Sequence, residues 1–305
     1  MSDYRITPSM ITSTTLDNLN SDLSALQRTS DELSSGKTIL EPSDNPYGAS
    51  REIDLQSQLD GLNSYTQSAQ DGISWETTAS GAMSSISSVV AKVRELLVQA
   101  GNGTLNKADR EHLGVEVTQL TESVKADANA KYGDEYVFSG TATGTPPYEQ
   151  GSNDSYAGNT ESVARQVGPG SSVTISTDIS SLLGNGPESG DGKLLDVLRT
   201  ISKHLEGGSP EDVEALESTD LKGLDQNYET LISLETKSGT AIDQFQSAIG
   251  GIESLQSTIT AALSNTDSAN IATTSIDFSN QQAAYTAALR AGATIVQESL
   301  LNFLQ

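Results

Sequence analysis

Apolar residues recur at helical spacing over the first third of the chain. Near the start, leucines follow one another at steps of 3, 4, 3 and 7 residues, which places them on one narrow stripe of a helix with polar residues elsewhere. This first stripe consists of Leu16, Leu19, Leu23, Leu26 and Leu33. A second stripe continues without a break through Ala79, Met83, Ile86, Val90, Val93, Leu97 and Ala100.

A glycine-containing segment separates the second stripe from the next helix. The stripe ends at GNGT (101–104), and Asn106 followed by Asp109 is typical of a helix start. We therefore expect a further helix after residue 106. Its apolar positions are Leu113, Val117, Leu120 and Val124.

The C-terminal half contains the longest helical pattern. Steps of 3 and 4 continue from Leu221 to Leu263, a stretch that would span roughly 60 Å as one helix at 1.5 Å per residue. After SNTDSAN (264–270) the phase changes and a last amphipathic helix is expected. Stripes this narrow need partner helices. The positions of the last helix are Phe278, Tyr285, Leu289, Val296, Leu300 and Phe303.

The middle of the chain has a different pattern. Residues 140–192 contain ten of the 26 glycines, and apolar residues alternate with polar ones around Val163 to Ile175. This predicts a small β insert of short strands and turns between helical arms. The expected fold is mainly α with a small β insert: an elongated rod of antiparallel long helices, with both termini together in a coiled-coil domain.

Composition and charge exclude several classes of function. Hydrophobic residues make up 35% of the chain and aromatic residues 5%, so its apolar surface needs long narrow elements or neighbouring subunits to be buried. The net charge of −24 disfavours binding to nucleic acid or to anionic membranes. Residues 1–40 and 266–305 together carry only −4 of it, which fits ends that pack in a crowded interior.

The residue types that carry chemistry are sparse. The chain has no cysteine, and neither His112 nor His204 has a second ligand at metal-binding spacing. We therefore predict no catalytic residue, no metal and no cofactor, and the chain is not expected to be an enzyme. The N-terminal MSDYRITPSMITSTTL lacks the apolar stretch of a cleaved signal peptide, so export would need another route.

Three segments together resemble a known protein family. The stretches ELSSGKTILEPSDNPYGAS (32–50), KVRELLVQAGNGTLNKADREHL (92–113) and IDFSNQQAAYTAALRAGATIVQESLLNFLQ (276–305) resemble, in order and spacing, the conserved blocks of bacterial flagellins and hook-filament junction proteins. YVFSGTATGTPPYEQ (136–150) resembles the block that opens the outer domain in the junction-protein branch. The resemblance covers about 200 residues, mostly in the two flanks.

The resemblance implies an architecture and partners. It implies a terminal coiled-coil domain (1–40 and 266–305) that lines the inner tube, a helical rod domain (41–138 and 193–265) and a β-rich outer domain (139–192). It also implies a homo-oligomeric ring or tube that contacts flagellin and another hook-associated protein. Export through the flagellar type III channel, with a chaperone on the C-terminal helix, would place the protein in the extracellular flagellum.

Two other interpretations stay open at this stage. The nearer one is flagellin itself, the bulk subunit of the filament, since short flagellins overlap this length. A more distant one is a secreted enzyme or adhesin with coiled-coil arms, which a cluster of convergent polar residues in the β insert would support. In the junction interpretation, the predicted assembly interface consists of the first leucine stripe (Leu16 to Leu33) and the last helix (Phe278 to Phe303).

Overall fold

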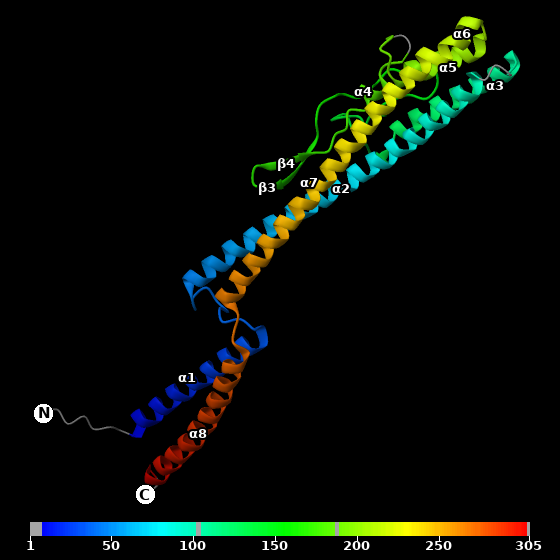
Figure 1. Ribbon diagram of the computed structural model, residues 1–305. Helices are drawn as coiled ribbons and strands as arrows, with labels where there is room; N and C mark the ends of the chain where they lie inside the picture. The colour runs from blue at the N-terminus through cyan, green and yellow to red at the C-terminus, as the bar shows by residue number, and fades with distance from the viewer. Residues whose placement is uncertain (1–7, 102–104, 187–188, 304–305) are drawn as a thin grey trace. The chain divides into compact units, whose positions relative to one another are not determined.

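The computed structural model describes residues 8–101, 105–186 and 189–303 (Figure 1). Long helices dominate it, and the strands form two small antiparallel sheets, as the sequence predicts. The helices are α1 (Pro8–Ser35), α2 (Pro46–Gly101), α3 (Lys107–Ala128), α4 (Ser180–Leu183), α5 (Leu194–Gly207), α6 (Pro210–Ala215), the π-helix η1 (Leu216–Asp220), α7 (Leu221–Asp267) and α8 (Ile271–Phe303). The strands are β1 (Lys131–Tyr132), β2 (Glu135–Tyr136), β3 (Ala164–Gly168) and β4 (Ser171–Thr174).

The chain divides into two compact units. The terminal unit contains the residues up to Gly61 and from Leu255 onward, and the central unit contains Leu62–Ser254. Among the described residues, no helix has both the length and the apolar character of a membrane-spanning segment.

In the central unit, α2 and α7 run antiparallel along each other. Gly72 lies against Phe245, Glu76 bonds to Ser238, and Arg94 pairs with Asp225, so residue numbers rise on one helix as they fall on the other. A side chain on Gly72 would overlap the Phe245 ring, which explains why glycine occupies this turn of α2. We call the buried stripe between these helices the α2–α7 seam. Its apolar members are Ala79, Met83, Ile86, Val90, Val93, Leu97 and Ala100 from α2, with Leu224, Leu231, Leu234, Phe245 and Ile252 from α7.

The α2 stripe predicted from the sequence is therefore confirmed, and the α7 stripe is confirmed with one exception. Tyr228 fits the 3,4 pattern but is 38% exposed. The adjacent Asn227 is buried instead, because its side-chain amide donates hydrogen bonds to the carbonyl oxygens of Gly192 and Gly223. A specific polar contact thus decides the orientation of this helical turn.

The α3 helix starts where the sequence predicts. Asn106 is its N-cap and accepts a hydrogen bond from the Asp109 amide at 2.9 Å. Helix α3 packs on α5, where Ser202 Oγ donates to the Gly114 carbonyl at 3.0 Å. Helix α5 lies within the segment 193–265 that was predicted to be helical, but no separate helix was predicted there, although it buries Leu194, Leu195, Leu198, Ile201 and Leu205.

The β component is smaller than the alternating pattern suggests. Strands β3 and β4 pair antiparallel, with an irregularity between Gln166 and Gly168 and a positive φ at Gly170 in the turn. The valines at 167 and 173 point inward, as predicted. Most of the described remainder of 140–192 is irregular chain, apart from the short helix α4.

Candidate assembly interface

In the terminal unit, α1 and α8 form an antiparallel pair. Thr29 Oγ1 donates a hydrogen bond to Gln281 Oε1 at 2.5 Å. Farther along α8, Gly292 lies against Thr15 and Leu19, so residue numbers fall on α1 as they rise on α8. The absence of a side chain on Gly292 lets the two helices approach closely at this point. Two helices alone, however, leave much of each surface open.

The predicted interface residues lie along this helix pair with graded exposure. Leu19, Leu23, Leu26, Leu33, Phe278 and Tyr285 are half-buried. Leu16 and Leu289 are exposed, at 56% and 44%. The side chains of Val296, Leu300 and Phe303 lie outside the described part of the structure.

Other apolar side chains on the same helices are also exposed, and they are not among the predicted interface residues. Ile11, Ile271 and Ile276 are between 40% and 61% exposed. Ile11 and Ile276 fall outside the 3,4 stripes, whereas Ile271 lies seven residues before Phe278 and has the same heptad position. Together with Leu16 and Leu289 they are exposed apolar side chains of α1 and α8 that the described part of one chain leaves uncovered.

The segment between α1 and α2 has a structure that explains its sequence. In the Asp-Asn-Pro motif, Asp44 accepts hydrogen bonds from the amides of Leu40 and Glu41, and Asn45 accepts one from the Gly48 amide. Pro46 then occupies the first position of α2, where its missing amide proton costs nothing. The hydrogen bond from the Glu41 amide is the main reason why the pKa of Asp44 is lowered.

The same segment is tied to the end of α7. Lys37 Nζ lies 2.6 Å from Asp267 Oδ2 and 2.5 Å from Glu52 Oε1, while the Thr38 amide donates to the Asp267 carbonyl. Hydrogen bonds to Asp267 and then to Glu52 raise the pKa of Lys37. Asp267, the last residue of α7, thus holds the connection between α1 and α2 through Lys37 and Thr38.

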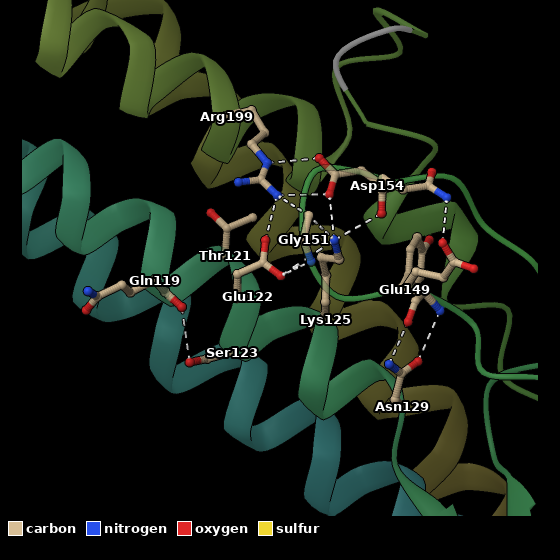
Figure 2. Close-up of polar contacts among 12 residues, drawn as sticks. Gln119, Thr121, Glu122, Ser123, Lys125, Asn129, Glu149, Gly151, Asp154 and Arg199 are labelled. Carbon is tan, nitrogen blue, oxygen red and sulfur yellow. Dashed lines mark hydrogen bonds and ion pairs between the residues drawn. The ribbon is translucent and has the colours of Figure 1, made fainter.

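A polar network in the central unit fixes an irregular loop onto α3 and α5 (Figure 2). The fully buried Lys125 donates to the carbonyls of Gly151 and Asn153 and pairs with Asp154 at 2.9 Å. Arg199 bridges Asp154 and Glu122 at 2.9 and 2.7 Å. Burial alone would raise the pKa of Asp154, but hydrogen bonds from Arg199 and Lys125 outweigh it and lower the pKa.

This network satisfies its own charges and leaves no reactive group. Two cations face two carboxylates, and the remaining donors of Lys125 reach backbone carbonyls. Its arrangement therefore stabilises a loop and does not resemble a site prepared for catalysis.

The histidines have ordinary structural environments. His204 Nδ1 lies 2.6 Å from Asp220 Oδ2, a partner in η1 that the sequence analysis did not identify. Burial raises the pKa of Asp220, and the hydrogen bond with His204 opposes this. His112 is exposed on α3, and the described residues contain no group of three or more metal-ligating side chains of His, Cys, Asp or Glu type.

Known proteins similar to this chain are flagellins and flagellar hook-associated proteins. Residues 6–143 match the family model of the bacterial flagellin N-terminal helical region. Flagellin of Bacillus subtilis is 31% identical over 58% of this chain, which spans 57% of that protein. Flagellar hook-associated protein 3 of Escherichia coli is 26% identical over 71% of this chain and 73% of its own length.

A solved structure has a similar fold. A flagellar hook-associated protein of Vibrio parahaemolyticus superposes with a TM-score of 0.66 at 18% identity, covering 74% of this chain and all of that one. The family match includes α1, the Asp-Asn-Pro segment and α2, whose geometry is described above. Its N-terminal part thus matches the helical region of bacterial flagellins, and the relatives it resembles are flagellins and flagellar hook-associated proteins.

Proposed function

We propose that this chain is a structural subunit of the bacterial flagellum that joins a hook-associated protein to the flagellin filament through helix packing. One observation carries the choice within the superfamily. Hook-associated protein 3 of E. coli corresponds to this chain over most of both lengths, whereas the B. subtilis flagellin corresponds over little more than half of its own.

The α1–α8 pair supports an assembly role. Several of its apolar side chains, among them Leu16 and Leu289, are exposed within one chain, and copies of the same pair arranged as a ring or tube would cover them. In this proposal residues 1–40 and 266–305 form the inner domain, 41–138 and 193–265 the rod domain, and 139–192 the outer domain. The interface residues are those predicted from the sequence, from Leu16 to Leu33 and from Phe278 to Phe303.

The proposal extends to partners and location. Flagellin and another hook-associated protein would meet the two faces of the ring. A chaperone would hold the C-terminal helix before export, and export would proceed without a cleaved signal peptide to the extracellular flagellum. The lack of cysteines agrees with a chain that passes through a narrow channel unfolded.

The alternative is that the chain is flagellin, the bulk subunit of the filament. The block 136–150 argues against flagellin because it resembles junction proteins. In this chain the block is packed into the core of the central unit. Phe138 and Tyr148 are fully buried, the Tyr148 hydroxyl donates to the Gly184 carbonyl at 2.8 Å, and Asn129 exchanges two hydrogen bonds with the Tyr148 backbone.

A deletion strain tests the assignment. Loss of a junction subunit should leave hooks intact while flagellin accumulates in the culture medium, and the wild-type gene should restore filaments. Hooks without shed flagellin would identify the chain as the filament subunit instead. Complete filaments in the deletion strain would contradict both assignments.

A further inference from the structure

A carboxylic acid is buried in the α2–α7 seam, and no cation among the described residues forms an ion pair with it. Glu76 is 2% exposed, and its side chain reaches Ser238 on α7. A cavity of about 470 Å³ adjoins it, lined by Ser172, Val173 and Thr174 of the β3–β4 hairpin and by Thr236, Ser238 and Thr240 of α7. Ionised carboxylates are very costly to bury without a pairing charge.

The contacts of Ser238 indicate which form of Glu76 is present. Ser238 Oγ lies 2.5 Å from Glu76 Oε2 and 3.2 Å from the Glu76 carbonyl oxygen. A serine hydroxyl has one proton, so it cannot donate fully to two acceptors. Both contacts are satisfied if a neutral Glu76 donates from Oε2 to Ser238 Oγ, and the Ser238 hydroxyl donates to the carbonyl oxygen.

The charged groups around the cavity do not replace that proton. Lys237 of α7 also borders the cavity, but its side chain is exposed and forms no ion pair with Glu76 among the described residues. On the hairpin, Arg165 is engaged with Asp71 of α2 at 2.7 Å. The hairpin residues that line the cavity are uncharged.

We propose that Glu76 is held as the neutral acid between α2 and α7, so that the stability of the central unit increases as the medium becomes more acidic. The cavity gives protons a route to the seam. This inference does not depend on the assembly role, since it concerns the packing of two helices within one chain.

The electrostatics agree in direction. The pKa of Glu76 is raised to about 7, mainly by burial, and donation from the Ser238 hydroxyl to an ionised Glu76 would offset only part of the effect of burial. Below about pH 4.5 the group is neutral in both the folded and the unfolded chain. As the pH rises to about 7, the unfolded chain loses this proton first, and folding loses stability over that interval.

Urea unfolding at about pH 5 and about pH 8 tests the proposal. Trp75, the sole tryptophan, is buried next to Glu76 in the sequence and reports the central unit by its fluorescence. For the full-length wild-type chain, Glu76 should make the unfolding equilibrium constant roughly 70-fold larger at the higher pH. Glu76→Gln, whose amide can donate to Ser238 as the neutral acid does, should remove this difference.

Controls separate the proposal from other causes. Glu229→Gln changes an exposed glutamate of α7 and should retain the wild-type pH dependence. Equal pH dependence in wild type and Glu76→Gln would overturn the proposal. If Glu76→Gln does not fold, the wild-type chain still decides: an NMR titration of the Glu76 side-chain carboxyl carbon should show a midpoint near 7, and an ordinary carboxylate midpoint would overturn it.

Discussion

The helix pairs α2–α7 and α1–α8 share the same 3,4 pattern of apolar residues but bury them to different extents. Every predicted position of the α2 stripe is buried, whereas Leu16 and Leu289 of the terminal pair are about half exposed. The central pair is covered further by α3, α5 and the loops between them, which supply side chains to one continuous core. The same pattern of apolar residues therefore occurs in a helix pair whose apolar side chains are buried within one chain and in a pair whose apolar side chains are partly exposed.

The difference also concerns polar groups. The central unit contains a buried lysine and a buried glutamate, each with hydrogen-bonding partners from distant segments. The terminal pair has simpler polar contacts, such as Thr29 with Gln281. Buried polar partners specify one arrangement of a core, and in the proposed assembly the α1–α8 pair would gain further contacts from neighbouring copies.

The largest expected effect on the central unit comes from Phe245→Ala. The ring is fully buried against the backbone of α2 at Gly72, and deleting it should lower the free energy of unfolding by about 4 kcal/mol. Ile232→Ala, at a 44% exposed position of the same helix, should cost less than about 1 kcal/mol. Urea unfolding followed by Trp75 fluorescence compares the two, and similar losses would mean that the seam is not packed as described.

The next effect is expected at the polar network. Lys125→Met removes the cation that joins Asp154 to the Gly151 loop, and should lower the free energy of unfolding by about 3 kcal/mol, because buried carbonyls and a buried carboxylate lose a donor. Lys222→Met, at an exposed position of α7, should change it by less than about 0.5 kcal/mol. A loss no larger than in the control would show that Arg199 alone holds Asp154.

The sequence predicted the parts of this fold that depend on local periodicity. The stripes of α2, α3 and α7, the Asn106 cap and the change of phase near residue 270 all follow from spacing along one segment. Helix α5 could also have been predicted as a separate helix, since Leu194, Leu198, Ile201 and Leu205 follow helical steps directly after the glycine-rich segment.

Other features depend on which segments meet in space. Lys125 and Asp154 are 29 residues apart, and Glu76 and Ser238 are 162 apart, so no spacing rule connects them. Tyr228 illustrates the same limit on a smaller scale, because the amide of the adjacent Asn227 donates to the Gly192 carbonyl, 35 residues away, and Asn227 is buried in place of Tyr228. The candidate interface depends on both kinds of information. The heptad pattern places its leucines on one side of the helix, whereas their exposure depends on how many helices pack against that side.

The smallest effect on the isolated chain, with a large effect on the flagellum, is expected from Leu23→Asp. Leu23 is half-buried on α1 in the terminal unit, so the free energy of unfolding reported by Trp75 should change by less than about 0.5 kcal/mol. In an assembled ring the new carboxylate would have to be desolvated in every copy, at a cost of several kcal/mol each. Motility in soft agar should therefore be lost while the variant is still found in the culture medium.

Asn18→Asp adds the same charge at an exposed position of the same helix, and cells with this variant should swim better than cells with Leu23→Asp. Normal swimming of Leu23→Asp would show that this leucine faces no neighbouring subunit, and the distinction between the completed and the open helix pair would lose its functional meaning.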